Sequence, residues 1–214
     1  MKQAILFDLD GTLIHSLPDI AAAMNRSLAA FGLPGFEESQ YKYKVGNGVF
    51  KLTERCVGER TDLTQQVREA YMADYAKNNQ VASHPFRGVS PMLKALSDAG
   101  MALAVLTNKD QTDAEHILAH YFPDIAFSAI RGRTEGVPLK PDPAGALLIA
   151  QSLGVQPENC WYVGDTSTDM NCGNAAGMET IGVLWGYRPM EELKQSGARH
   201  LVASTEELTQ LALS

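Results

Sequence analysis

Cysteine is scarce in this sequence, which has only Cys56, Cys160 and Cys172 among its 214 residues. They form no C-x-x-C pair, and an odd number of cysteines cannot pair completely within one chain. This usage excludes a disulfide scaffold and is typical of a reducing, intracellular compartment. We therefore expect a cytoplasmic protein that is stabilised by a hydrophobic core, for which the chain is long enough.

Long hydrophobic runs and an excess of basic residues are also absent. The apolar stretch that begins at Ala4 ends at Asp8, too early for a signal peptide or a membrane span. Lys and Arg number 18 against 25 Asp and Glu, so the formal net charge is −7. Proteins that bind nucleic acid or a membrane surface through phosphate groups need a basic face. The composition therefore predicts neither nucleic acid nor membrane as a partner.

Short apolar runs alternate with helical patterns along most of the chain. Near-continuous apolar runs, typical of strands covered on both faces, occupy residues 4–9, 101–107, 125–130, 160–163 and 180–185, with a weaker sixth at 200–203. Helical spacing with suitable end residues occurs at 90–99, 143–153 and 167–176. Strands that alternate with helices predict an α/β fold with a doubly wound, Rossmann-like parallel sheet.

One interval breaks this alternation. Roughly 75 residues without a convincing strand separate the first predicted strand from the helix at 90–99, although a crossover needs only about a dozen. Within the interval, residues 18–31 and 62–75 show apolar positions at helical spacing. We therefore predict an α-helical insert at 16–83, and a sheet-containing core formed by 1–15 and 84–214.

Two acidic residues end the first predicted strand. Asp8 and Asp10 are two positions apart, so their side chains point to the same side of the strand. Two such carboxylates repel each other unless a cation or a proton lies with them. Asp10-Gly11 alone would also suit a turn, whereas a calcium loop would need glycine where Leu13 stands. A catalytic or metal site is the favoured interpretation.

A second acidic pair follows the predicted strand at 160–163. Asp165 lies at the end of this strand, and Asp169 lies four residues later, one turn into the next helix. Asp169 could simply cap that helix and interact with its dipole. A second acid at a strand end is what a hard divalent cation requires, which favours a metal-binding role for Asp165.

Two further segments carry groups that suit a phosphate. Thr107 and Asn108 end the second predicted strand with a hydroxyl and an amide, although such residues are also common in turns. Lys140 precedes Pro141 and Pro143, which restrict the backbone as it enters a helix. A lysine in a rigid segment is more plausibly a positioned cation than a solvated surface charge.

Taken in this order, these segments resemble the motifs of the haloacid dehalogenase superfamily of phosphohydrolases. The matching residues are Asp8-Leu9-Asp10-Gly11-Thr12, Thr107-Asn108, Lys140-Pro141, and Gly164-Asp165 with Asp169. The resemblance covers almost the whole chain, and the predicted insert lies where the helical-cap branch of that superfamily carries its cap. Within the branch, residues 45–52 and 85–89 resemble the corresponding segments of phosphoglycolate phosphatases.

The resemblance implies a Mg²⁺-dependent phosphatase. Asp8 would be the nucleophile that forms an aspartyl-phosphate, and Asp10 would serve as general acid and then as general base. Mg²⁺ would be held by the Asp8 carboxylate, the Asp10 backbone carbonyl and Asp165. Asp169 would orient Lys140 or a metal-bound water.

The resemblance also implies a binding site for a small phosphorylated metabolite. Thr107, the Asn108 backbone and Lys140 would bind the transferring phosphoryl group, where charge must be stabilised. The further residues expected to bind phosphate or substrate are Gly11, Thr12, Gly46 and Asn47. His15 stands where this branch usually has an acidic residue, so hinge behaviour and substrate preference can differ from the family pattern.

Several alternatives remain open at this point. The same residues would suit a pyrophosphatase, a sugar-phosphate or nucleotide phosphatase, or a phosphomutase of the same superfamily. A different class is a non-catalytic phosphate-binding protein or a phospho-receiver, which also combines strand-end acids, threonine and lysine. The sequence does not distinguish a monomer from a homodimer.

Overall fold

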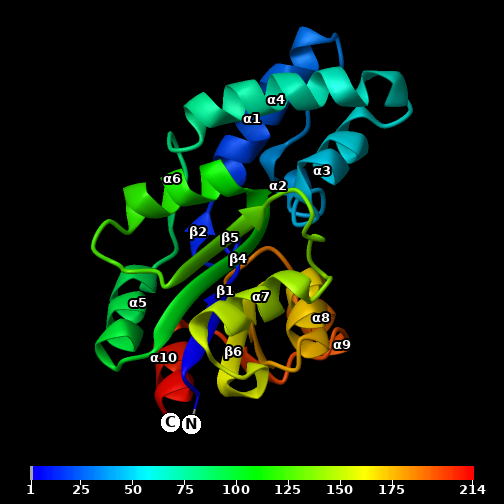
Figure 1. Ribbon diagram of the computed structural model, residues 1–214. Helices are drawn as coiled ribbons and strands as arrows, with labels where there is room; N and C mark the ends of the chain where they lie inside the picture. The colour runs from blue at the N-terminus through cyan, green and yellow to red at the C-terminus, as the bar shows by residue number, and fades with distance from the viewer. Residues whose placement is uncertain (1) are drawn as a thin grey trace.

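The computed structural model, which describes residues 2–214, has two parts that lie one above the other in Figure 1. The lower part contains a parallel sheet flanked by helices, and the upper part is built from the helices of residues 17–78. Two short linkers join them, so the chain leaves the sheet after its first strand and returns before its second.

Six strands form the sheet in the order β5-β4-β1-β6-β7-β8, and all neighbouring pairs are parallel. The strands are β1 (Ala4–Phe7), β4 (Ala102–Asp110), β5 (Ala129–Arg133), β6 (Cys160–Gly164), β7 (Glu179–Val183) and β8 (His200–Val202). The chain winds outward from β1 to β5 and then, in the other direction, from β6 to β8. This order confirms the predicted doubly wound sheet and puts its switch point between β1 and β6, where such sheets bind ligands.

The two faces of β1 belong to different hydrophobic clusters because side chains alternate along a strand. Ile5 and Phe7 belong to the cluster that includes helices α5 (Val89–Asp98), α6 (Gln111–Tyr121) and α10 (Thr205–Leu213). On the opposite face, Ala4 and Leu6 pack with α7 (Ala144–Leu153) and α8 (Ser167–Ala175). Burial on both faces explains why the strand sequences are continuously apolar. The remaining elements here are the short helix η2 (Pro157–Asn159) and α9 (Met190–Gln195).

The upper part has a hydrophobic cluster of its own. Its elements are α1 (Leu17–Ala30), α2 (Glu38–Tyr41), α3 (Gly48–Val57), η1 (Thr61–Leu63) and α4 (Thr64–Asn78). The apolar residues at helical spacing on α1 and α4, among them Met24 and Tyr71, meet in this cluster. Tyr187, from the loop after β7, also belongs to it and thus ties the helical part to the sheet part.

The two linkers cross as a small antiparallel pair. β2 (Ile14–His15) and β3 (His84–Pro85) bring His15 opposite His84. The sequence indicated no strand in this interval, because two residues are too few to show an alternating pattern. The side chain of Asp19, on α1, accepts hydrogen bonds from the backbone N–H groups of residues 81, 82 and 83, which fastens the returning linker to the helical part.

The strand predicted at 125–130 exists, but it begins later than predicted. The strand β5 begins only at Ala129, and Ile125 and Phe127 precede it in the connection from α6. Both side chains are partly buried against the main cluster, so the apolar run reports burial of a loop rather than strand pairing. Apolar periodicity alone cannot separate these two causes.

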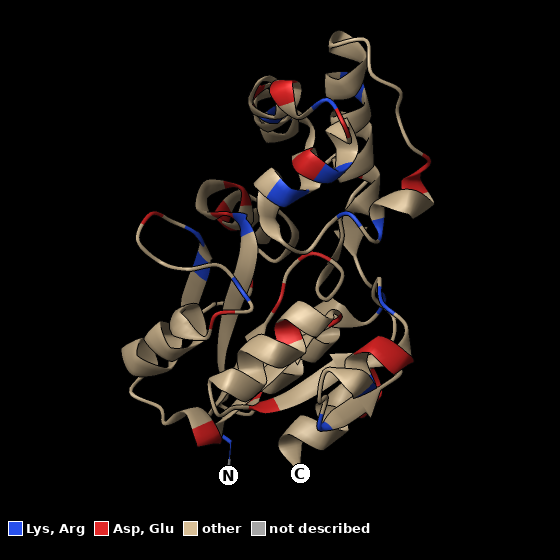
Figure 2. Cartoon of the chain, turned by 90° about the vertical axis from the view of Figure 1, so that its right-hand side faces the viewer, with Lys and Arg blue, Asp and Glu red and all other residues tan. Residues whose placement is uncertain are grey.

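Charged residues of both signs are spread over the surface. Figure 2 shows basic and acidic segments interspersed over this view of the molecule. Within residues 2–214, no helix combines the length and the hydropathy needed to span a membrane. All three cysteines are buried and free, as small core residues are.

Candidate active site

Asp8 lies where β1 ends, and its carboxylate is buried. Its backbone N–H still donates to the Val163 carbonyl, so the strand pairing with β6 fixes its position. Oδ1 of Asp8 accepts hydrogen bonds from the Leu9 N–H at 2.7 Å and from Lys140 Nζ at 2.8 Å. Only Oδ1 has a hydrogen-bond partner within the described chain, which leaves Oδ2 as a candidate nucleophile or ligand.

Lys140 joins two acids of the predicted site. Its ammonium group lies 2.8 Å from Asp8 Oδ1 and 2.7 Å from Asp169 Oδ1, and its side chain is almost fully buried. Burial lowers the pKa of Lys140, but the charges of Asp169 and Asp8 outweigh it and hold this pKa above the usual value. Lys140 is therefore a fixed cation rather than a solvated surface lysine.

Asp165 is enclosed by groups that hold both of its oxygens. Oδ1 accepts from the Thr12 hydroxyl at 3.1 Å, and Oδ2 accepts from the Tyr187 N–H at 2.8 Å. Glycine is needed on two sides: a Cβ on Gly11 would lie 2.4 Å from Asp165 Oδ2, and one on Gly186 would lie 2.2 Å from Asp165 Cβ. Both backbone segments approach this carboxylate more closely than any side chain allows.

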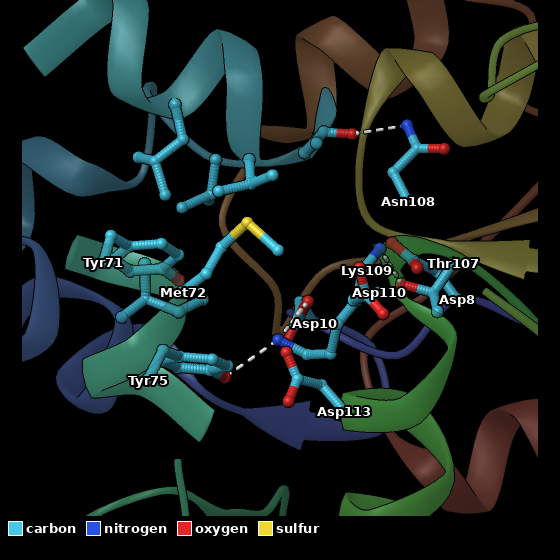
Figure 3. Close-up of a pocket in the computed structure, with 16 residues that line it drawn as sticks. Asp8, Asp10, Tyr71, Met72, Tyr75, Thr107, Asn108, Lys109, Asp110 and Asp113 are labelled. Carbon is cyan, nitrogen blue, oxygen red and sulfur yellow. Dashed lines mark hydrogen bonds and ion pairs between the residues drawn. The ribbon is translucent and has the colours of Figure 1, made fainter. Parts of the chain in front are cut away.

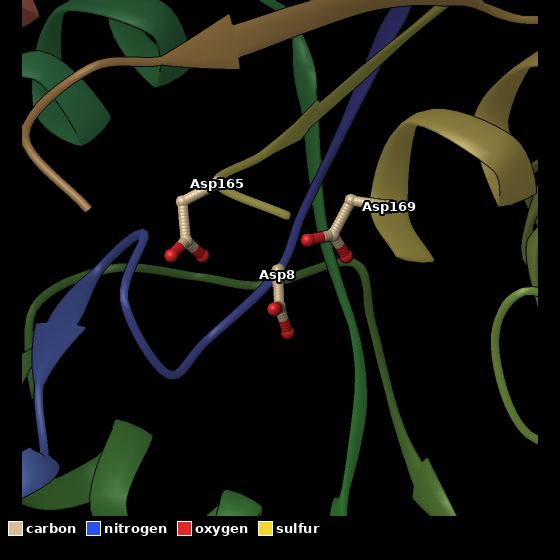
Figure 4. A group of neighbouring side chains, drawn as sticks. All are labelled: Asp8, Asp165 and Asp169. Carbon is tan, nitrogen blue, oxygen red and sulfur yellow. The ribbon is translucent and has the colours of Figure 1, made fainter. Parts of the chain in front are cut away.

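Three carboxylates converge at the switch point (Figure 4). Asp8, Asp165 and Asp169 each offer an oxygen, and these oxygens lie within 4.8 Å of one another. Burial and the nearby charge of Asp169 raise the pKa of Asp8 to about 7, although Lys140 opposes this. Burial, together with Asp169 and Asp8, also raises the pKa of Asp165 well above its ordinary value.

This donor set fits a divalent metal ion. Asp165 has no salt-bridge partner among residues 2–214, although it is fully buried next to other acids. A buried group of carboxylates with too little positive charge is stabilised by a hard cation, which prefers oxygen ligands. The three carboxylates each offer an oxygen within 4.8 Å of the others, so the buried cluster could hold a metal.

Asp169 has less capacity for a metal than the other two acids. Oδ1 binds Lys140, and Oδ2 accepts from both the backbone N–H and the hydroxyl of Thr166. Thr166 and Asp169 thereby form a capping box at the start of α8. The sequence suggested either a helix cap or a partner of Lys140 for Asp169. Its carboxylate makes both contacts, because Oδ2 caps α8 while Oδ1 accepts from Lys140.

Asp10 points into a pocket beside Asp8. Its Oδ1 accepts from the Ser16 hydroxyl at 2.5 Å, and its Oδ2 pairs with Lys109 Nζ at 3.1 Å. Lys109 Nζ also donates to the Tyr75 hydroxyl at 2.8 Å, which links β4 to helix α4 of the upper part. Asp10 is therefore held by Ser16, which follows β2, and by Lys109, which lies near the end of β4.

The pocket lies between the sheet and the helical part (Figure 3). It offers about 80 Å³ to water-sized molecules. The helical part contributes Ile20, Val45, Gly46, Gly48, Val49, Leu52, Tyr71, Met72 and Tyr75, and the sheet part contributes Asp8, Asp10, Thr107, Asn108, Lys109, Asp110 and Asp113.

The remaining predicted residues divide between lining and support. Thr107 and Asn108 line the pocket, but the Asn108 amide already donates to the Gly46 and Lys140 carbonyls and accepts from the Lys140 N–H. Asn108 can therefore offer a ligand only its backbone. Gly46 lines the pocket, whereas Asn47 does not: its side chain donates to the Thr168 hydroxyl and accepts from Arg55.

Sequence reasoning missed several residues that shape this site. Lys109 directly follows Thr107-Asn108, so its adjacency to a recognised segment was an available signal. Ser16 and Asp113 are ordinary polar residues without a local pattern. Tyr187 accepts hydrogen bonds from the Ser16 and Leu17 N–H groups through its hydroxyl, while its own N–H binds Asp165. Nothing near Tyr187 in the sequence indicates this.

The sequence is similar to a known protein family and to individual proteins. A family model described as haloacid dehalogenase-like hydrolase matches residues 5–183. A phosphoglycolate phosphatase of Pectobacterium atrosepticum is 34% identical over 199 residues, covering 91% of this chain and 85% of that protein. One from Haemophilus influenzae is 33% identical and covers 89% of each.

Solved structures share the fold of this chain. A Lactobacillus delbrueckii protein has a TM-score of 0.95 at 27% identity, with 100% of both chains covered. A predicted phosphoglycolate phosphatase from Haemophilus somnus has a TM-score of 0.92 at 28% identity and covers 98% of this chain and 97% of that one. The match extends over the helical part as well as the sheet.

Proposed function

Because the chain belongs to the haloacid dehalogenase-like hydrolases, we propose that it is a Mg²⁺-dependent phosphatase of small phosphomonoesters, with 2-phosphoglycolate as its substrate. The observation that carries this proposal is that the Asp8 carboxylate lines a small pocket, is held through Oδ1, and has no hydrogen-bond partner at Oδ2 among the described residues. Two relatives that are 34% and 33% identical over most of this chain are phosphoglycolate phosphatases, which supports the choice of substrate.

The covalent step uses Asp8 and Asp10. Asp8 attacks phosphorus, the bond from phosphorus to the ester oxygen breaks, and its electron pair moves to that oxygen. Asp10, protonated in this step, gives its proton to the departing oxygen. An aspartyl-phosphate on Asp8 and a free alcohol result. Asp10 then accepts a proton from the water that hydrolyses the aspartyl-phosphate, which restores both residues and releases phosphate.

The phosphoryl oxygens would be bound by the end of β4 and by Lys140. Thr107 lines the pocket, and its hydroxyl accepts the Lys109 N–H at 3.2 Å, so its proton remains available for a phosphoryl oxygen. The backbone of Asn108 adds a donor, since its side chain is occupied. Lys140 lies 2.8 Å from the attacking carboxylate and would offset charge as it accumulates.

Mg²⁺ would be held by the carboxylates of Asp8 and Asp165 with the backbone carbonyl of Asp10. When bound, this ion supplies charge neutralisation that lets an anionic carboxylate approach an anionic phosphate. Thr12 and Gly11 would serve the site by fixing Asp165, the first through a hydrogen bond and the second through close packing. Asp169 would hold Lys140 in place.

Residues 16–83 would act as a cap that closes the pocket. The cap touches the core through Asn108, which binds the Gly46 carbonyl, and through Asn47, which binds Thr168. Its apolar side chains exclude water from the reacting groups and limit the size of the leaving group.

The experiment is a phosphatase assay on purified protein. We expect Mg²⁺-dependent hydrolysis of p-nitrophenyl phosphate that disappears with chelator, and an Asp8→Asn variant that is folded but inactive. A panel of 2-phosphoglycolate, pyrophosphate, nucleotides and sugar phosphates then tests the substrate. Retained activity in Asp8→Asn would overturn the mechanism, and equal turnover on the whole panel would reject the phosphoglycolate assignment.

A further inference from the structure

We propose that Lys109 determines substrate specificity by binding a carboxylate on the leaving group of the phosphomonoester, an inference that rests on the proposed phosphatase function. Lys109 lies outside the segments on which the family resemblance depends. The substrate class that it would select is short phosphomonoesters with a second anionic group close to the ester oxygen.

The position of Lys109 supports this role. Among the described residues that line the pocket, Lys109 is the only one with a positive charge. Its side chain is only 6% exposed, so its ammonium group is shielded from bulk water when the pocket is closed. A cation in such surroundings attracts an anion far more strongly than a solvated lysine does.

The ammonium group of Lys109 has a donor to spare. A lysine has three N–H donors, and the described partners of Nζ are Asp10 Oδ2 and the Tyr75 hydroxyl. The charge also lies 4.5 Å from the centre of the Tyr75 ring, in the range of a cation–π contact. These contacts hold Nζ in place and leave one N–H for a ligand.

The distance to Asp10 limits the length of the leaving group. Asp10 must reach the ester oxygen to protonate it, and Lys109 Nζ lies 3.1 Å from Asp10 Oδ2. A group that binds Lys109 therefore lies within about three hydrogen-bond lengths, or ~9 Å, of the ester oxygen. A carboxylate one carbon away from that oxygen satisfies this limit.

The acids near Lys109 raise the opposite possibility, that the leaving group carries an ammonium group. Asp110 is paired with Arg133, so its charge is already compensated. Burial raises the pKa of Asp113, which disfavours the ionised form that would bind a cation. The anionic leaving group is therefore the one that the pocket favours.

The experiment compares three phosphomonoesters of similar size: 2-phosphoglycolate with an anionic leaving group, ethyl phosphate with a neutral one and O-phosphoethanolamine with a cationic one. kcat/KM is measured with Mg²⁺ for the wild type, Lys109→Met and Tyr75→Phe. The control is Lys94→Met, which removes an exposed lysine paired with Asp98 on α5, far from the pocket lining.

We expect the wild type to prefer 2-phosphoglycolate. Lys109→Met should lower kcat/KM for 2-phosphoglycolate by about 100-fold and for ethyl phosphate by less than about tenfold. Tyr75→Phe should change the same ratio in the same direction by a smaller factor, and Lys94→Met should not change it. The difference between substrates separates anion binding from a general disturbance of Asp10, which would affect all three esters equally.

Two results would overturn the inference while leaving the phosphatase proposal intact. One is an equal loss on 2-phosphoglycolate and ethyl phosphate in Lys109→Met, which would confine Lys109 to positioning Asp10. The other is a wild-type preference for O-phosphoethanolamine. Failure of the wild type to hydrolyse any of these esters or p-nitrophenyl phosphate would instead reject the proposed function itself.

Discussion

Replacing Asp8 by asparagine should abolish turnover and, at the same time, stabilise the metal-free protein. Burial raises the pKa of Asp8 from 3.8 to about 7 despite the pairing with Lys140. At ~1.4 kcal/mol for each pKa unit, keeping this carboxylate ionised above pH 7 costs the fold about 4 kcal/mol. Asparagine removes that cost and keeps an acceptor oxygen for the Leu9 N–H and for Lys140.

The sign of the pH dependence follows from the raised pKa of Asp8. A carboxyl whose pKa is higher in the folded state contributes stability below its unfolded pKa, and this contribution is lost as the pH rises toward about 7. The wild type should therefore lose stability between about pH 4 and pH 7, where the Asp8→Asn variant has no such group to titrate. The stability difference between the two proteins should open in this window.

The assay is urea unfolding of both proteins in chelator at pH 8 and pH 5. We expect Asp8→Asn to be more stable by about 4 kcal/mol at pH 8, a midpoint shift of about 2 M urea, and by less than half of that at pH 5. Asp62→Asn serves as the control, because Asp62 is exposed and paired only with Arg60. A variant less stable than the wild type at pH 8, or a difference that ignores pH, would refute the reasoning.

Three further substitutions test other contacts. Asn108→Ala removes the amide that binds the Gly46 carbonyl and both backbone groups of Lys140; it should cost about 1–3 kcal/mol in urea unfolding and reduce kcat/KM at least tenfold, so unchanged kinetics would contradict this role. Gly186→Ala would press a methyl group against Asp165, so it should lower stability by about 1–3 kcal/mol and weaken Mg²⁺ binding in titrations; wild-type affinity would speak against it. His15→Asp should stay within about tenfold of the wild-type kcat, because His15 contacts His84, Phe86 and Tyr187 rather than the pocket lining; a collapse of kcat would reveal a specific role.

The local sequence pattern predicted most of the sheet and the acids at its edge. Continuous apolar runs marked β1 and β6 because both faces of these strands are covered, and acidic residues followed each run. Parallel strands direct their carboxyl ends to one edge, so Asp8 and Asp165 meet once β1 and β6 lie side by side, as the structure has them. The same reasoning placed the start of β5 too early, because the buried loop that contains Ile125 and Phe127 has the same composition as a strand.

The sequence by itself determined the α/β architecture and the identity of the strand-end carboxylates, since both depend on short-range periodicity and on residue type. Only the tertiary structure decided that Lys109 lies between Asp10 and Tyr75, and that Tyr187 connects Asp165 with the first linker. These contacts join residues far apart in the chain, and each depends on how the helical part packs on the sheet. No local pattern encodes such a contact, because its free energy arises only when distant elements have already been brought together.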